Sequence, residues 1–412
     1  MNAFDGRQMR RPGFAALISL VLALCATCSA PARTLNVVRL PEYRARHAVE
    51  QGRVRSTIVD TLARRVLRKL NETELGTRVS LDVLVLSGGG QYGAFGAGVL
   101  SGWRTVEDPA LRLPEFDVVT GISTGALLAP FAFLGDAHSH EQVIELYEQV
   151  DDDWAIVKAT FFFLPWRPAF FDRSALDDYI DEHVDPAIVG RLASASREDR
   201  LLLVGSTNLD LGSMHIWNLT ELATELEHGD DLSRLHGAML ASSAIPGAFE
   251  PVEIDGMLHV DGAVSRNLFV SPDPHVLPEV LHEIERLGGD PARVCTRVWM
   301  IVNGSLHSDA SVVAAGWPSI VGRSIQLLMN ATTLATLRLS EQVVETLNAH
   351  RAGSAEFRFV CLPGDARPAP HGRLFDRKFM AELVRLGARV GSDPSSWRCD
   401  ADPPFAAPPG EH

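Results

Sequence analysis

Residues 81–90 have the sequence LDVLVLSGGG, in which a run of β-branched residues and leucines ends in three glycines. A short apolar run bounded by glycines is typical of a buried β-strand that ends in a tight loop. A helix is expected next, at residues 93–103. A strand, a glycine loop and a helix in this order predict the start of a parallel sheet.

The same alternation of strands and helices continues along the chain. A second strand is expected at residues 116–120 and an apolar helix at residues 125–134. Later strands are expected at residues 201–204 and 298–302. We therefore predict an α/β fold with a mainly parallel central sheet and helices on both faces.

The composition is that of an ordinary globular protein, with 412 residues, 46% hydrophobic and 22% charged. We expect a catalytic core at residues 79–270 and a largely helical C-terminal part of the same domain at residues 271–390. Residues 391–412 are rich in proline and are expected to form a loose tail. A formal net charge of -14 gives no reason to expect nucleic acid as a partner.

The first 32 residues have the organisation of a secretory signal peptide. Three arginines precede an apolar stretch at residues 14–26, and small residues follow up to Ala32. The stretch is shorter than the roughly 20 residues that span a bilayer. We expect export, to the periplasm, to a membrane surface or into the medium. A retained anchor, or lipidation at Cys25 after the lipobox-like residues 22–24, are the alternatives.

Cleavage after Ala32 would leave three widely spaced cysteines, Cys295, Cys361 and Cys399. An odd number at these spacings is no disulfide framework, although one pair could still form. No C-x-x-C pair would remain, so we expect no structural zinc site of that type.

A basic segment at residues 33–78 precedes the core, with eleven Arg and Lys against five Asp and Glu. Apolar residues recur every four positions from Val54 to Leu70, which predicts a helix with one apolar stripe flanked by basic side chains. Such a helix either lies on an anionic membrane or packs on the main domain with its basic face in water. We favour the second arrangement.

Residues 121–125, GISTG, stand between the second strand and the apolar helix. In this setting G-x-S-x-G predicts a nucleophile elbow, a tight turn that leaves no room for side chains beside the serine. The turn would hold the Ser123 hydroxyl at a helix N-terminus, where N–H groups favour developing negative charge. We therefore expect Ser123 to be a nucleophile.

The glycines at Gly88, Gly89 and Gly90 have two candidate uses, and both depend on backbone N–H groups at a helix start. With Gly93 they match the dinucleotide fingerprint G-x-G-x-x-G, but no acidic residue stands at a strand end about 20 residues later. The Lys-Ser/Thr ending of a phosphate-binding P-loop is also missing. Ahead of a nucleophile elbow, the loop better fits an oxyanion hole.

A base for the serine is expected at Asp261, which a strand at residues 256–260 delivers to a Gly-Ala turn. An aspartate with a pKa of about 3.9 is a poor base, but burial raises its pKa. His350 or His371 could instead complete a histidine triad. His259 would share a strand face with Asp261, and we expect it to be a packed core residue.

At these positions the chain resembles bacterial, exported members of the patatin-like phospholipase family of lipid acyl hydrolases. The resemblance extends from about residue 83 to residue 267, over the blocks at residues 88–93, 121–125, 171–172, 241–249 and 261–263. It implies a patatin-like fold with Ser123 as nucleophile, Asp261 as base and the amides of Gly88, Gly89 and Gly90 as oxyanion donors. In that family a basic residue often follows the glycines. Tyr92 stands here instead, which weakens the expectation of a contact to a phosphate headgroup.

Together these features predict a serine hydrolase that cleaves carboxylic esters of lipids, of the phospholipase A or lipid acyl hydrolase type. It would act at a membrane surface on lipid or phospholipid, with no metal or organic cofactor and no specific protein partner inferred. A triad esterase or peptidase, and an inactive membrane-associated interaction protein, are the alternatives. The aromatic stretch at residues 161–171 is either core or a lipid-contacting loop.

Overall fold

The computed structural model describes residues 33, 35–148, 169, 171, 173–226, 231–271, 273–306, 308, 310–349, 353–364, 366 and 375–399. The predicted signal peptide, His350, His371 and most of the aromatic stretch lie outside these residues. Among the residues described, no helix is both long enough and apolar enough to cross a membrane.

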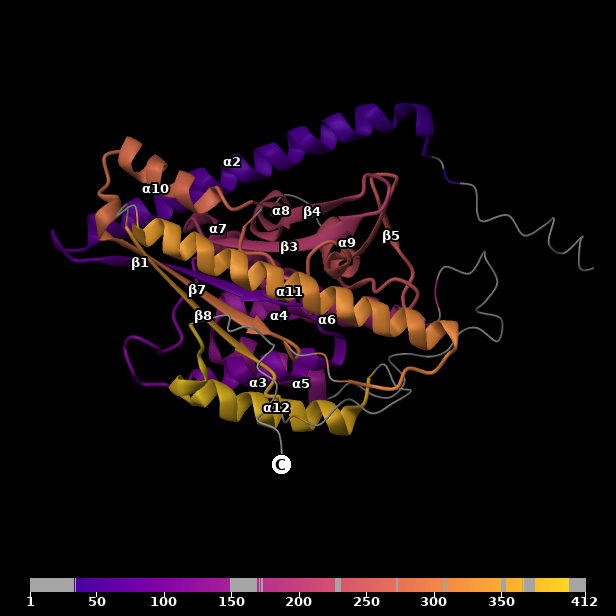
Figure 1. Ribbon diagram of the computed structural model, residues 1–412. Coiled ribbons are helices and arrows are strands. Elements are labelled where there is room, and N and C mark those ends of the chain that lie inside the picture. Colours follow the sequence, from indigo (N-terminus) through magenta and orange to yellow (C-terminus); the bar gives the residue numbers. More distant parts are fainter. Residues whose placement is uncertain are drawn as a thin grey trace, which may run out of the picture.

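An eight-stranded sheet forms the centre of the molecule, with strand order β5-β6-β3-β2-β1-β7-β8 and β4 paired to β3 (Figure 1). The strands are β1 (Val79–Leu86), β2 (Val118–Gly121), β3 (Leu201–Asn208), β4 (Ser213–Asn218), β5 (Val252–Ile254), β6 (Met257–Asp261), β7 (Val294–Val302) and β8 (Ser354–Cys361). The five strands β3, β2, β1, β7 and β8 are parallel, whereas β4, β5 and β6 are added antiparallel. The predicted α/β fold with a mainly parallel sheet is confirmed.

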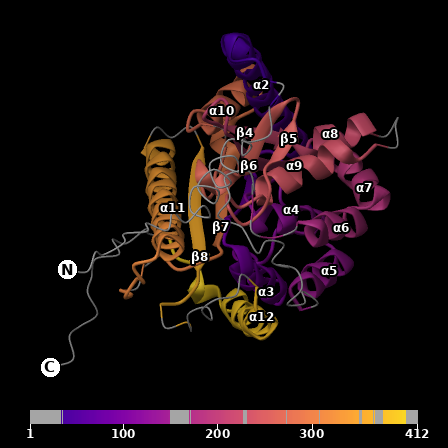
Figure 2. The ribbon, with the colours of Figure 1, turned by 90° about the vertical axis from the view of Figure 1, so that its right-hand side faces the viewer.

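Helices cover both faces of the sheet (Figure 2). One face carries α3 (Gly93–Trp103), α4 (Thr124–Leu134), α5 (Ala137–Glu148), α6 (Ser174–His183), α7 (Pro186–Arg197), α8 (Leu219–Leu226), α9 (Ser233–Ser243) and α12 (Arg377–Ser392). The other face carries α2 (Leu40–Glu72), α10 (Val276–Arg286) and α11 (Trp317–Ala349). Both faces of β1 are buried, so its side chains are apolar on both sides. Leu84 and Leu86 pack in the core under α3, α4 and α12, and Val83 and Val85 pack in the core under α2, α10 and α11.

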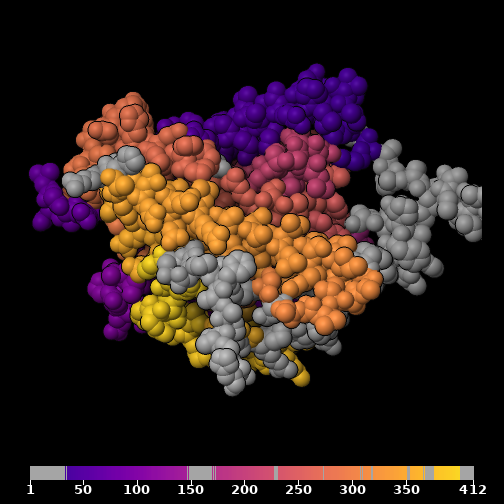
Figure 3. Space-filling view, in the orientation of Figure 1, coloured from indigo at the N-terminus to yellow at the C-terminus, as the bar shows by residue number. Residues whose placement is uncertain are grey.

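The C-terminal part contains β7 and β8 as well as three helices. Strand β8 was not predicted, although Ala355, Phe357 and Phe359 alternate on one face of it and are buried. The long helix α11 crosses the surface of the molecule next to these strands (Figure 3). The three described cysteines are all free.

Helix α2 packs on the main domain through its apolar stripe, which is buried from Val54 to Leu70. Its basic side chains are partly exposed, but many of them pair with acidic groups of the domain, which corrects the expectation of a basic face free in water. Arg65 and Lys69 pair with Asp117, whose side chain is 0% exposed, at 2.8 and 2.7 Å. Other basic side chains of α2 pair with acidic groups of the domain, namely Arg53 with Glu221, Arg55 with Asp273 and Glu279, and Arg64 and Arg68 with Asp199. A buried carboxylate needs such partners, since an unpaired charge there costs several kcal/mol, on the order of 3 to 5.

The described part of the predicted tail, residues 391–399, packs on the domain. Helix α12 ends at Ser392, and the chain continues through a 3-10 turn to Trp397, which is 5% exposed. The Trp397 ring lies 4.2 Å from that of Trp103 and 5.2 Å from that of Trp299, measured between centroids. Arg398 exchanges two backbone hydrogen bonds with Phe359 of β8, each 2.9 Å. The first residues of this proline-rich segment therefore pack against the core.

Candidate active site

Strands β2 and β6 meet end to end along one edge of β3. Residues 118–121 of β2 pair with residues 201–204 of β3, and residues 259–261 of β6 pair with residues 206–208. Strand β4 pairs with residues 203–208 along the other edge. Because β2 is parallel and β6 antiparallel to β3, their carboxyl ends point toward each other. This register brings Ser123, just after β2, to Asp261, at the end of β6.

Ser123 occupies a strained turn between β2 and α4. Its φ is 54° and its ψ is -126°, in the left-handed half of the map that side chains avoid. A Cβ on Gly121 would lie 2.4 Å from the carbonyl oxygen of Gly125, and one on Gly125 would lie 2.4 Å from that of Leu86. Both flanking positions of the G-x-S-x-G sequence therefore have room for glycine alone.

Two serines of α9 fix the turn from the other side. The Ser123 N–H donates to the Ser242 hydroxyl at 3.1 Å, and that hydroxyl donates to the carbonyl of Gly205 at 2.7 Å. The Ser243 hydroxyl donates to the Ser123 carbonyl at 3.2 Å. The sequence had pointed to residues 241–249 as a block without giving these two serines a role. Their hydrogen bonds satisfy the backbone of a buried, strained residue.

Asp261 is 3% exposed, and its carboxyl accepts the N–H of Ala263 at 2.8 Å. Burial raises its pKa to about 6, against the opposing effects of the nearby Ser123 hydroxyl and of the Ala263 N–H. At neutral pH the group is ionised, yet it is a much stronger base than an exposed aspartate. The Ser123 hydroxyl and the Asp261 carboxylate, called the dyad below, are thus arranged as a hydroxyl and a base between which a proton could pass.

The glycine loop lies against the dyad. A Cβ on Gly88 would lie 3.2 Å from the Cβ of Ser123, so the loop packs directly on the serine side chain. The N–H of Gly88 donates to the carbonyl of Asn267 at 3.0 Å, which corrects the expectation that all three amides are free for an oxyanion. Among the described residues the N–H groups of Gly89 and Gly90 have no acceptor, so these two remain as donors.

Asn303, which follows β7, supports the glycine loop from behind. Its N–H donates to the Ser87 hydroxyl at 2.7 Å and its side-chain amide donates to the Ser87 carbonyl at 2.8 Å. A Cβ on Gly89 would lie 2.1 Å from the Asn303 carbonyl oxygen. Sequence analysis missed Asn303 because it belongs to none of the three motifs and lies more than 200 residues from the loop.

A narrow cavity of about 40 Å³ adjoins Ser123. Its lining is apolar except beside the dyad, and consists of Gly90, Ser123, Thr124, Leu127, Tyr147, Leu176, Ser243, Ile245, Phe249, Phe375 and Met380. Sites that enclose a small ligand have volumes of about 300–1,000 Å³, so the described walls must move apart to admit an acyl chain. Phe171, the described end of the aromatic stretch, lies 6.4 Å from Phe249 between ring centroids and donates its N–H to Ala248.

Two other residues of the sequence analysis do not line this cavity. Tyr92 packs edge-on against Phe379 of α12, with ring centroids 5.6 Å apart. His259 is 1% exposed and bonds to the Ser206 hydroxyl through Nδ1 at 2.9 Å. Burial lowers the His259 pKa to about 4, so the ring is neutral at pH 7. This is the environment of a packed core histidine.

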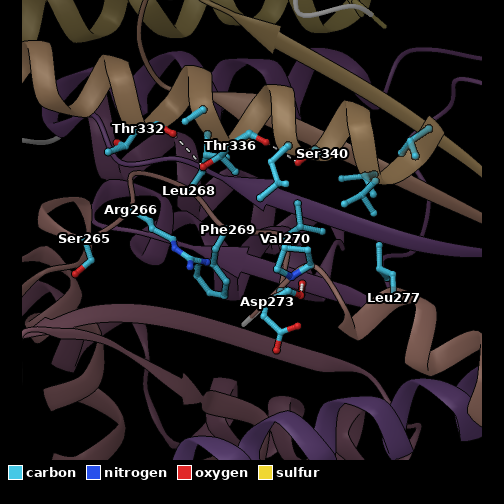
Figure 4. A pocket seen from close by; sticks show the side chains of 17 residues that line it. Ser265, Arg266, Leu268, Phe269, Val270, Asp273, Leu277, Thr332, Thr336 and Ser340 are labelled. Carbon is cyan, nitrogen blue, oxygen red and sulfur yellow. Dashed lines mark hydrogen bonds between the residues drawn. The ribbon is translucent and has the colours of Figure 1, made fainter. Parts of the chain in front are cut away.

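A second cavity, of about 260 Å³, lies on the other face of the sheet, between α11 and residues 265–277 (Figure 4). Thr332, Thr336 and Ser340 of α11 border it opposite Leu268 and Phe269. Its walls belong to the core beneath α2, α10 and α11, whereas the cavity at Ser123 opens into the other core. The two cavities are therefore separated by the sheet.

Residues 84–273 match the model of a protein family described as patatin-like phospholipase. The match includes the glycine loop, Ser123 and Asp261, and it implies a lipid acyl hydrolase. No curated protein matches the chain in sequence. A crystal structure of VipD from Legionella pneumophila is 12% identical over 77% of this chain and 67% of that chain, with a TM-score of 0.31. So distant a likeness adds nothing to the assignment.

Proposed function

We propose that the protein is a serine hydrolase that cleaves carboxylic esters of lipids with Ser123 as nucleophile and Asp261 as base. The observation that carries this proposal is the strand register that brings the Ser123 hydroxyl to the buried carboxyl of Asp261, whose pKa is raised. The strained turn at Ser123 and the match to the patatin-like phospholipase family support it.

In the first half of the reaction, Ser123 Oγ attacks the acyl carbonyl carbon and its proton passes to Asp261. The carbonyl electron pair moves onto oxygen, next to the N–H groups of Gly89 and Gly90 and the N-terminus of α4. Pre-oriented donors of this kind each lower the barrier by about 3 kcal/mol. The oxyanion then collapses, the bond to the alcohol breaks, and Asp261 returns the proton to the leaving oxygen.

In the second half, water attacks the acyl-serine and gives a proton to Asp261. Collapse of the second oxyanion releases the fatty acid, and the proton returns to Ser123 Oγ. Each half-reaction leaves Asp261 ionised, which is its state at neutral pH. The chemistry of both steps is supplied by the two side chains, the amides and water.

The substrate proposal is a lipid ester with an apolar acyl chain, because the walls of the cavity at Ser123 are formed largely by Leu127, Leu176, Phe249, Phe375 and Met380. We propose export and action at a membrane surface from the N-terminal sequence alone. The basic side chains of α2 do not support binding to a membrane, because many of them pair with acidic groups of the protein.

A fluorophosphonate probe and a short-chain p-nitrophenyl ester test the proposal. We expect the probe to label Ser123 of the wild type, and Ser123→Ala to abolish both labelling and hydrolysis. Asp261→Asn should lower kcat by about 10²–10⁴-fold, the usual contribution of a positioned base. Ser194→Ala, an exposed serine of α7, is the matched control and should behave as the wild type. Full esterase activity in Ser123→Ala would show the mechanism to be wrong.

Replacing His259, His350 and His371 separately with Gln distinguishes the dyad from a histidine triad. The dyad predicts that all three variants retain the wild-type kcat. Collapse of activity in one correctly folded variant would instead identify a triad base. Stoichiometric probe labelling of the wild type would rule out the inactive-scaffold alternative.

A further inference from the structure

Three side chains that commonly bind metals meet where α2 passes over β4, away from the dyad. His47 and Glu50 stand three residues apart on α2 and so lie on the same helix face. His215 is on β4. One ligand atom from each of the three lies within 4.8 Å of the other two.

The spacing of the two histidines fits a tetrahedral metal site. Their Nδ1 atoms are 3.3 Å apart. Zinc–nitrogen bonds of about 2.0–2.1 Å at tetrahedral angles place two ligand nitrogens about 3.3–3.4 Å apart. We propose that His47, Glu50 and His215 bind one divalent transition-metal ion, and that this ion is zinc. Two imidazoles and a carboxylate are ligands that zinc accepts at catalytic and structural sites alike.

Neighbouring groups hold the two rings in place. The Ser213 hydroxyl is 3.2 Å from His47 Nε2, and a hydrogen bond on the second ring nitrogen is what orients a metal-bound histidine. The His215 ring lies 3.9 Å from the Trp217 ring between centroids and is 4% exposed.

A cavity of about 560 Å³ opens beside the cluster and is lined by His47, Glu50, Tyr43, Met257 and several charged residues. It gives an ion a path from solvent and leaves room for water as a fourth ligand. Three protein ligands and one open position are the pattern of zinc sites that stay accessible.

The arginines around this cavity have other partners, so their charge is partly neutralised. Arg53 pairs with Glu221, and Arg46 lies over the ring of Tyr43 at 5.3 Å. Arg234 pairs with Asp255 at 3.4 Å and reaches Glu50 only at 4.0 Å. The Glu50 carboxylate is therefore free to turn toward an ion between the histidines.

No sequence motif marks this site, because His215 lies 165 residues after Glu50 and no cysteine takes part. A bound ion would join α2 to β4 and stabilise the folded state by mass action. The same 3.3 Å spacing also suits one ring donating an N–H to the other, and the experiment separates the two arrangements.

The test uses untagged full-length protein, stripped with EDTA and exchanged into metal-free buffer. Calorimetric titration with Zn²⁺ and metal analysis after gel filtration should give one equivalent per chain. Replacement of zinc by Co²⁺ should give the intense visible absorption of a four-coordinate site. Zinc should also raise the melting temperature of the stripped protein.

Glu50→Gln is the decisive variant because it is isosteric and the side chain is only half-buried, so the fold should be retained. It should bind zinc at least tenfold more weakly, whereas Glu42→Gln, an exposed position on the same helix, should bind as the wild type does. His47→Asn and His215→Asn should lose the site. Less than half an equivalent in the wild type, or unchanged affinity in Glu50→Gln, would overturn the proposal. Ester hydrolysis by Ser123 is measured in parallel and should not depend on zinc.

Discussion

The backbone carbonyl of Asn267 accepts the N–H of Gly88 at 3.0 Å. This bond joins the segment that follows the base to the loop that packs on the nucleophile. The Asn267 side chain in turn donates to the Thr333 hydroxyl of α11 at 2.9 Å, so a helix on the opposite face also supports the loop. The positions of Ser123, Asp261 and the glycine loop are thus mutually dependent.

Alanine substitutions in the glycine loop should have graded effects. Gly89→Ala should lower kcat by at least 10²-fold, because its Cβ would lie 2.1 Å from the backbone of Asn303 and the loop must move. Gly90→Ala meets no atom within 4 Å but has a φ of +56°, so it should cost about 1–2 kcal/mol of stability and much less activity. Steady-state kinetics and denaturant unfolding measure both. Equal loss of kcat in the two variants would contradict the arrangement.

Activity should depend on the protonation of Asp261. Because its pKa is raised to about 6, kcat/KM should rise with pH through about 6 and level off above it. A midpoint near 4 would show that the carboxyl is not desolvated in the free enzyme. The ionisation of a carboxyl group has a small enthalpy, so the midpoint of the kcat/KM profile should stay almost constant on warming. The midpoint set by a histidine base would shift with temperature.

Asp261 should also destabilise the protein at high pH. Its folded-state pKa of about 6 exceeds the unfolded value of 3.8, so the folded state holds the proton more tightly. Stability from this group is present below pH 3.8 and is lost as pH rises through about 6. At two pKa units this amounts to about 3 kcal/mol. Asp261→Asn should therefore be more stable than the wild type at pH 8 and equal to it at pH 3. A difference that does not change with pH would contradict this expectation.

The pairing of α2 with Asp117 should be essential for stability. Lys69→Met or Arg65→Met leaves the buried carboxylate short of one partner and should cost about 3 kcal/mol or more. Arg39→Met removes an exposed ion pair with Glu42 and should leave the free energy of unfolding almost unchanged. Urea unfolding measures both free energies. Similar losses of unfolding free energy in the buried-pair and exposed-pair variants would show that burial of Asp117 does not determine the contribution of its ion pairs.

Local motifs predicted the centre of the fold well because the conformation of each motif is determined by residues within it. The glycine loop, the turn at Ser123 and the helix Gly93–Trp103 depend on residues adjacent in sequence. The meeting of β2 and β6 depends on their common partner β3, so the sequence suggested Asp261 as a base without placing it.

Features that depend on residues distant in sequence were either not predicted or predicted wrongly. The basic side chains of α2 find acidic partners 48 to 224 residues away, which no periodicity reveals. Trp397 belongs to the core because Trp103 and Trp299 pack against it, whereas residues 393–396 before it are aspartate, proline and two serines. The Gly88 amide is engaged by a carbonyl from a loop that follows the third motif.

The ion pairs of α2 also constrain the order in which the chain folds. Arg55 pairs with Asp273 and Glu279, 218 and 224 residues downstream. A chain synthesised from its N-terminus must therefore be about two-thirds complete before this helix can make its full set of contacts. Contacts so far apart in sequence close slowly, because the entropy of a long loop is lost before any favourable contact forms. Docking of α2 is thus expected to be one of the last events in folding.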